Sequence, residues 1–225
     1  PLIEQPLMRN VLADLALESE AATALSLRLA RAFGSDDGPD SAHEQAMRRL
    51  LTPVAKFWIC KRGSHFAQEA MECLGGNGYV EEAGEGVMAR LYREMPLNSI
   101  WEGAGNIMAL DLLRALRSSG KGGDADAIAA LHCELAPARS AHATLNTFAS
   151  RLFTRLDEAR DEIGARQLAQ DIALAVQAAL LCQHAPSHVF DAFCRTRLDA
   201  DWGHAFGTLP SNVDFEALLA RAMPQ

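Results

Sequence analysis

Apolar residues recur at three- and four-residue steps through most of the chain, which is the spacing of one face of a helix. The first such stretch covers about residues 3–33 and ends at the turn-forming run Gly34–Asp40. The second covers about residues 41–74. Ser41 is placed to cap it, with Glu44 three residues later completing a capping box. Two long helices joined by a short turn predict an antiparallel hairpin.

Helical spacing continues to the end of the chain. We expect shorter helices over residues 81–94, 98–119, 124–135, 138–162, 165–184, 187–205 and 212–223. No run alternates as a half-buried strand would. The predicted fold class is therefore all-α, an up-and-down four-helix bundle with an additional C-terminal helical extension. The Gly- and Ser-rich segment 118–123 is a linker signal, which predicts two domains, 1–120 and 121–225.

Composition narrows the classes of function. The chain has 225 residues, 49% of them hydrophobic, and a formal charge of -8. This acidic balance disfavours a general DNA-binding role, because nucleic-acid binders are usually basic, but it leaves room for a local basic patch. No run is apolar enough to predict a membrane span. The chain begins at Pro1 rather than Met, and we expect it to be a piece of a longer protein.

The cysteines and histidines suggest no disulfide framework and no metal site. The five cysteines are scattered and contain no C-x-x-C pair, which is typical of reduced core thiols and predicts a cytoplasmic protein. His184 and His188 are four residues apart, but Pro186 lies between them and no acidic residue stands at ligand spacing. We therefore predict no bound metal.

The first candidate motif is the segment Glu72–Tyr79. Gly75, Gly76 and Gly78 fall within four positions of it. Glycines let the backbone approach a ligand closely and adopt positive φ angles. A simple helix C-cap followed by a turn gives the same pattern, so the motif alone leaves both interpretations open.

The second candidate motif is the segment Arg90–Ile107, which contains Glu102 next to Trp101 and a Gly-Ala-Gly run. A carboxylate beside an aromatic ring and a tight backbone can lose water, and a desolvated carboxylate is a better base near neutral pH. The alternative is that Glu102 only stabilises the first turn of a helix that Asn98 or Ser99 caps.

In this order and spacing, the two motifs resemble the acyl-CoA dehydrogenase family. That family combines a Gly-Gly-x-Gly-Tyr loop, an Arg-containing helix and an Ile-x-Glu-Gly turn, and the resemblance covers about residues 1–120. The run Arg-Leu-Tyr-Arg-Glu-Met-Pro-x-Asn-Ser-Ile-Trp-Glu-Gly is closer to the AidB branch, flavoproteins linked to the adaptive response to alkylation. The helical C-terminal extension of that branch corresponds to residues 121–225.

The resemblance implies an activity, a cofactor and an assembly. Glu102 takes the position of the base that removes the α-proton of an acyl-CoA, while a hydride passes from the β-carbon to FAD. The resemblance implies FAD contacts at Glu72, Gly75, Gly76, Gly78, Gly103, Ala104 and Asn106. The glycine loop of the family usually touches the FAD of a neighbouring subunit, which implies a homotetramer or a dimer. Because the resemblance places most of the flavin and acyl sites outside this chain, we expect the isolated chain to be colourless and inactive.

Four positions depart from the family pattern: Pro6, Glu72, Glu94 and Ala104. Glu72 stands where Gln is common, and Ala104 where Thr is common, so an acid replaces an amide and one hydroxyl contact is missing.

Two other functions stay open. One is an AidB-like flavoprotein that binds DNA in the alkylation response with little dehydrogenase flux; the acidic residues 121–225 disfavour it. The other is a helical domain that only builds an oligomer. The sequence indicates neither the acyl chain length nor the electron acceptor.

Overall fold

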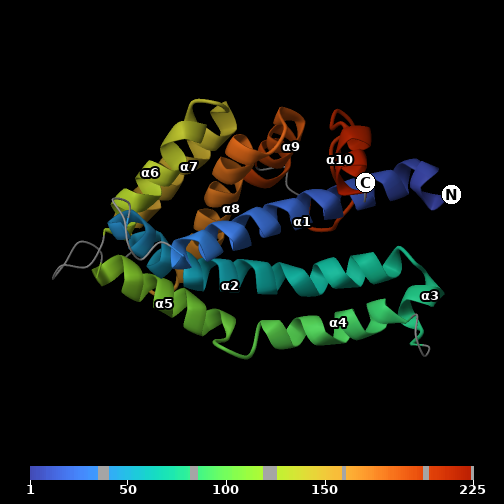
Figure 1. Cartoon of the computed structure of the whole chain (residues 1–225), viewed down its shortest axis with the longest axis horizontal. Coiled ribbons are helices and arrows are strands. Elements are labelled where there is room, and N and C mark those ends of the chain that lie inside the picture. Colours follow the sequence, from blue (N-terminus) through green and yellow to red (C-terminus); the bar gives the residue numbers. More distant parts are fainter. Residues whose placement is uncertain (35–40, 82–85, 119–125, 159–160, 200–202, 224–225) are drawn as a thin grey trace.

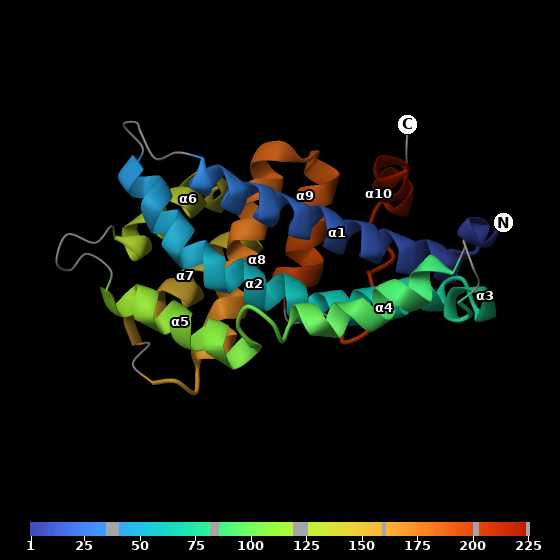
Figure 2. The same cartoon turned by 60° about the horizontal axis from the view of Figure 1, so that its bottom comes forward.

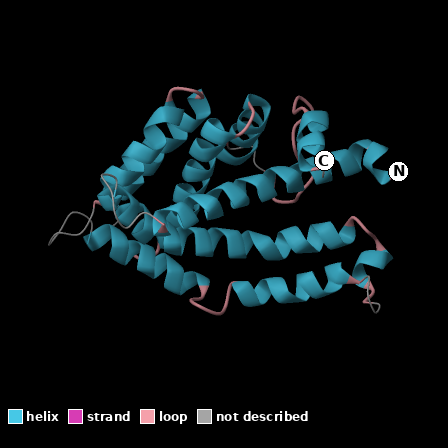
Figure 3. Ribbon diagram, viewed as in Figure 1, coloured by secondary structure: helices cyan, strands magenta, loops and turns pink. Residues whose placement is uncertain are grey.

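The computed structural model places helices along almost the whole chain (Figure 1, Figure 3). The residues that it describes are 1–34, 41–81, 86–118, 126–158, 161–199 and 203–223. Their ten α-helices are α1 (Pro6–Phe33), α2 (Ser41–Glu72), α3 (Gly76–Tyr79), α4 (Val87–Asn98), α5 (Gly105–Ser118), α6 (Ala127–Arg139), α7 (Ala143–Glu158), α8 (Ala165–His184), α9 (Ser187–Phe193) and α10 (Phe215–Ala222). These residues contain no strand, and the predicted all-α class is confirmed.

The long helices α1 and α2 form the predicted antiparallel hairpin (Figure 1). Leu17 and Leu25 of α1 are fully buried, as are Leu50 and Val54 of α2, and all four belong to one hydrophobic cluster. Steps of four and eight residues place such pairs on one face of a helix. The periodic pattern of the sequence thus becomes the contact between these two helices.

Helices α4 and α5 follow one another along α2, with a turn over residues 99–104 between them (Figure 2). Both pack against α2. The turn therefore lies near the middle of α2, where Lys56 is found. This arrangement holds Glu102 next to the longest helix of the described residues.

Helix α8 lies at the centre of the molecule, although it belongs to the predicted extension. It packs against α1, α2, α5, α6 and α7, and every residue from Asp171 to Leu181 is buried. A helix that is buried on all sides is typical of a core. The hydrophobic cluster contains residues from both predicted domains, and the boundary near residue 120 remains a prediction.

A buried ion network joins α1, α2 and α6. Arg28 donates to Glu44 at 2.7 Å and to Glu134 at 2.6 Å. His43 Nε2 lies 3.3 Å from the Glu134 carboxylate. Glu44, which the sequence placed in a capping box, thus forms an ion pair between α1 and α2.

A second network joins α1, α2 and the π-helical turn Cys194–Leu198 that continues α9. Arg197 donates to Asp14 and, at 3.3 Å, to Glu18. Arg62 of α2 donates to Glu18 at 2.9 Å. The backbone N–H of Gly207 donates to Asp14 at 2.9 Å. These contacts attach the C-terminal segment to the first hairpin.

The helix boundaries around Glu102 differ from the prediction. Helix α4 continues through Pro96 to Asn98, and α5 begins only at Gly105. Glu102 therefore lies in a turn, and the alternative that made it a first-turn helix acid is wrong. The predicted turn over 34–40 and linker over 118–123 fall almost entirely outside the described residues.

Two features are absent from the described residues, a membrane-spanning helix and a metal-binding cluster. No helix in these ranges is long and apolar enough to cross a membrane. Within the same ranges, no group of three or more His, Cys, Asp or Glu side chains is arranged to hold a metal ion.

Candidate active site

Glu102 has an unusual backbone conformation. Its φ angle is 55°, and within the described residues it is the sole non-glycine residue with positive φ. This left-handed region costs an L-residue about 1–2 kcal/mol relative to the right-handed one. Gly103 follows with a φ of 111°, where glycine is favoured. Conformations of this kind persist only where surrounding contacts enforce them, and they cluster at functional sites.

Lys56 of α2 supplies such contacts. Its Nζ donates to the carbonyl oxygen of Asn98, the last residue of α4, and to that of Trp101 at 2.9 Å. Carbonyls at the end of a helix lack a partner within the helix, so the ammonium group satisfies them. Hydrogen bonds from a charged donor are stronger than neutral ones. Lys56 thereby fixes the backbone on the N-terminal side of Glu102, a role that the sequence analysis missed.

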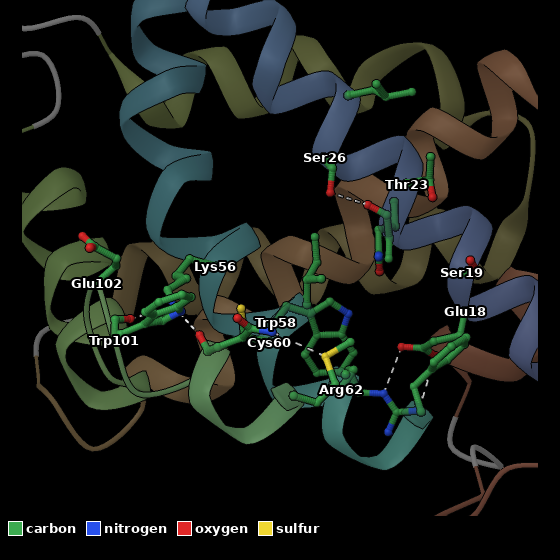
Figure 4. Close-up of a pocket in the computed structure, with 18 residues that line it drawn as sticks. Glu18, Ser19, Thr23, Ser26, Lys56, Trp58, Cys60, Arg62, Trp101 and Glu102 are labelled. Atoms are coloured by element: carbon green, nitrogen blue, oxygen red, sulfur yellow. Dashed lines mark hydrogen bonds and ion pairs between the residues drawn. The ribbon is translucent and has the colours of Figure 1, made fainter. Parts of the chain in front are cut away.

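A cavity of about 730 Å³ adjoins this turn (Figure 4). It is lined by α1, α2, α4, the turn and Gln177 of α8, and its walls are mainly apolar. Trp101 and Glu102 lie at one end, and the Glu18–Arg62 ion pair lies at the other. Glu102 therefore lies on the rim of an apolar space, and Figure 4 shows its carboxylate turned away from the other labelled residues.

The Glu102 carboxylate is available to a ligand. Its side chain is exposed, and no side chain or backbone N–H of the described residues forms a hydrogen bond or ion pair with it. The desolvation that the sequence suggested is thus not provided by this chain alone. A general base must reach the proton that it takes, and an unpaired carboxylate at an exposed turn meets that requirement.

The start of α5 packs tightly against α2. A Cβ on Gly105 would lie 2.7 Å from Lys61 Cε and 3.6 Å from a carbon of the Phe57 ring, so a larger residue would displace the helix or the lysine. Asn106 follows, and its Oδ1 accepts a hydrogen bond of 3.0 Å from Arg166 of α8. The segment that contains Gly103, Ala104 and Asn106 is held by two other helices.

The glycine loop between α2 and α3 has an open backbone. Gly75 has a φ of 59°, and a Cβ on Gly75 or Gly76 would meet no atom within 4 Å. A Cβ on Gly78 would lie 2.1 Å from the Met71 carbonyl oxygen, so the turn itself requires that glycine. The uncovered backbone at Gly75 and Gly76 fits the close approach of a cofactor such as FAD.

The end of α2 beside this loop is acidic. Burial, followed by the charges of Glu72 and Asp14, raises the pKa of Glu69. Burial, followed by the charges of Glu69 and Glu72, raises the pKa of the Cys73 thiol. The Glu72 side chain is exposed. A phosphate group that approaches the loop would therefore meet electrostatic repulsion.

The predicted cofactor contacts form two groups in a single chain. Gly103, Ala104 and Asn106 lie beside Glu102, whereas Glu72 and the glycine loop lie at the opposite end of α4 (Figure 1). The twelve residues of α4 span about 18 Å at the usual rise of an α-helix. The two groups are thus too far apart to surround one small chemical group together.

Comparison with known proteins agrees with this geometry. A family model described as "Acyl-CoA dehydrogenase, C-terminal domain" matches residues 1–117, just over half of the chain. The chain belongs to the acyl-CoA dehydrogenase family. It is 43% identical over 203 residues to the putative acyl-CoA dehydrogenase AidB of Escherichia coli K12, a match that covers 90% of this chain and 35% of AidB. Because this match is longer than 117 residues, the likeness includes part of the C-terminal helices.

Two solved structures share the fold of most of this chain. Caenorhabditis elegans ACDH-11 in complex with C11-CoA superposes with a TM-score of 0.70 at 27% identity, covering 88% of this chain and 37% of that one. The apo form of Bd2924 gives a TM-score of 0.64 at 30% identity, covering 80% and 34%. The acyl-CoA dehydrogenase-like chain described here thus spans about a third of the length of these relatives.

Proposed function

We propose that this chain is the C-terminal helical part of an FAD-dependent acyl-CoA dehydrogenase in which Glu102 is the catalytic base. The observation that carries the proposal is the strained turn, in which Glu102 has a φ of 55° and Lys56 fixes the preceding carbonyls. The turn holds an unpaired carboxylate at the rim of an apolar cavity. Family membership supports the class of reaction, the oxidation of an acyl-CoA.

Glu102 takes the α-proton of the acyl thioester in the proposed reaction. The C–H electron pair becomes part of the new double bond between the α- and β-carbons, and the β-carbon loses a hydride. FAD, when bound, supplies the acceptor for that hydride. Lys56 fixes the backbone that positions the carboxylate, and exclusion of water from the exposed Glu102 would need parts of the full-length protein outside this chain. The ACDH-11 complex with C11-CoA supports an acyl-CoA as the substrate.

Two groups of residues would hold FAD in the assembled protein. The open backbone at Gly75 and Gly76 can approach the cofactor closely, and Asn106 offers a side-chain amide. Their separation along α4 supports contacts with the cofactors of two different subunits, and hence a homotetramer or a dimer. Tyr79 beside the glycine loop and Ile100 in the turn before Glu102 both expose apolar side chains, which supports contacts with other protein at each of the two groups. Five free cysteines support a cytoplasmic location.

The substitution Glu102→Gln in the full-length protein tests the assignment of the base. We expect acyl-CoA oxidation to fall by about 10²- to 10⁴-fold, the usual contribution of a general base, with FAD content unchanged. Glu20→Gln is the matched control, because Glu20 is paired with Arg221 on the surface of α1. Normal oxidation by Glu102→Gln would contradict the assignment.

The two other functions are distinguished by the same protein. Salt-dependent DNA binding together with oxidation that is insensitive to Glu102→Gln would favour the alkylation-response function. An intact oligomer with neither FAD nor oxidation would favour a purely structural domain.

A further inference from the structure

One side-chain contact links the predicted extension to the candidate cofactor segment. Arg166, in the first turn of α8, donates from Nη1 to Oδ1 of Asn106 at 3.0 Å. The Arg166 guanidinium also lies 5.4 Å from the centroid of the Phe57 ring, which is 6% exposed. Phe57 adjoins Gly105, so the arginine lies over the start of α5. Arg166 is outside residues 1–117, which the family model matches.

The chemistry of this contact determines how the Asn106 amide is oriented. A guanidinium group has only donors, so the side chain facing Arg166 must present its oxygen. The Nδ2 group, with its two hydrogens, is thereby directed away from Arg166. Within the described residues, no acceptor bonds to Nδ2 of Asn106. Asn106 is thus fixed as a donor toward whatever approaches the segment.

We propose that Arg166 is a positioning residue for FAD: it orients the Asn106 amide so that Nδ2 donates to an oxygen or nitrogen acceptor of the cofactor. This inference rests on the proposed function, which assigns Asn106 to the cofactor. Helix α8 then contributes to the site as well as to the core. The positive charge of Arg166 lies over Phe57, near the middle of α2 and away from the acidic end of that helix, and it favours an anionic cofactor beside Asn106.

The affinity of the full-length apoprotein for FAD tests the proposal, measured by titration with FAD. Arg166→Gln should weaken binding about three- to tenfold, the range expected for one hydrogen bond. Glutamine can either donate or accept, so it no longer fixes the amide orientation. Arg166→Lys keeps a donor-only side chain and should recover part of the affinity. In an Asn106→Ala background, Arg166→Gln should cause no further loss, because Arg166 acts through Asn106.

Arg151→Gln is the matched control. Arg151 lies over the Phe148 ring, 5.8 Å from its centroid. Its replacement by glutamine removes a similar ring contact without affecting the α5 segment. Its FAD affinity should equal that of the wild type. Unchanged affinity in Arg166→Gln, or losses that add in the double variant, would overturn the role of Arg166 while leaving the proposed function intact. A wild-type protein that binds no FAD would overturn both.

Discussion

Glu102 is the residue at which backbone strain and chemistry coincide. Glycine is favoured over alanine at positive φ by about 1 kcal/mol, because it lacks the Cβ that clashes there. We therefore expect Glu102→Gly to exceed Glu102→Ala in free energy of unfolding by about 1 kcal/mol, measured by urea denaturation. Glu94, exposed inside α4, is the control, since there glycine should be the less stable of the two by about 1 kcal/mol. If alanine were the more stable replacement at both positions, Glu102 would not be strained.

Glu72 is a residue at which charge opposes the proposed ligand. It is exposed beside the glycine loop, and its charge already raises the pKa of Glu69, second to burial, and the pKa of Cys73, after burial and Glu69. Glu72→Gln in the full-length protein should therefore bind FAD a few-fold more tightly at low salt. The gain should shrink as ionic strength rises from about 0.01 M to about 1 M, where screening shortens electrostatic reach from about 30 Å to about 3 Å. A gain that is independent of salt would point to a steric cause.

At the scale of the helices, local patterns predicted the hairpin but not the turn at Glu102. The apolar spacing in α1 and α2 determines both helices, because each buries one face. The end of α4 depends instead on Lys56, which is about 40 residues away in the sequence and satisfies the carbonyls of Asn98 and Trp101. Pro96 suggested an earlier end, since proline disfavours the helix interior. A contact between distant segments cannot be read from the spacing around Pro96.

The glycines of the loop between α2 and α3 should separate folding from binding. Gly78→Ala places a Cβ 2.1 Å from a backbone oxygen, so it should destabilise the protein by about 2 kcal/mol or more. Gly76→Ala meets no atom within 4 Å and should leave thermal stability unchanged. If a cofactor approaches this backbone, Gly76→Ala should still weaken FAD binding in the full-length protein. Stability measured by thermal denaturation and affinity measured by FAD titration would then diverge at Gly76.

Unaltered FAD affinity in Gly76→Ala would contradict a close approach of the cofactor to this backbone. Gly75→Ala is a less suitable probe, because Gly75 has a φ of 59° and any replacement is strained. The two neighbouring glycines thus differ in what they can test, a distinction that requires the backbone angles and not only the motif.

At the scale of the whole molecule, the two predicted domains share one hydrophobic cluster. The linker signal and the length of the family resemblance suggested a boundary near residue 120. Helix α8 nevertheless packs between α1 and α7, because Asp171–Leu181 has too little polar surface for a solvated helix. The Arg28–Glu134 pair also joins α1 to α6. Such contacts depend on which helices meet, and the periodicity of each helix does not specify its neighbours.

The Arg28–Glu134 pair makes stability depend on pH. Burial opposes ionisation of Glu134, but the hydrogen bond and charge of Arg28, with those of His43, outweigh it, so the pKa of Glu134 is lowered. The folded chain then holds this proton less tightly than the unfolded chain, and stability falls as pH drops below about 4.5 toward the folded value. Glu134→Gln should lose about 1.5–3 kcal/mol near pH 7, a loss that shrinks in this acidic range. Urea denaturation at intervals of about one pH unit, from about pH 3 to about pH 7, would measure this change as a shift of the midpoint.

Asp171 makes stability depend on pH in the opposite direction. Burial raises its pKa, although Gln167 and Arg155 favour the ionised form. The folded chain therefore holds this proton more tightly than the unfolded chain, and the contribution is lost as pH rises from about 3.8 through the folded value. As pH rises through this acidic range, the stability of Asp171→Asn relative to the wild type should increase. The stability of Glu134→Gln relative to the wild type should decrease over the same range. Parallel pH profiles for the two variants would contradict the assignment of these opposite shifts, and with it the view that Arg28 rather than burial controls Glu134.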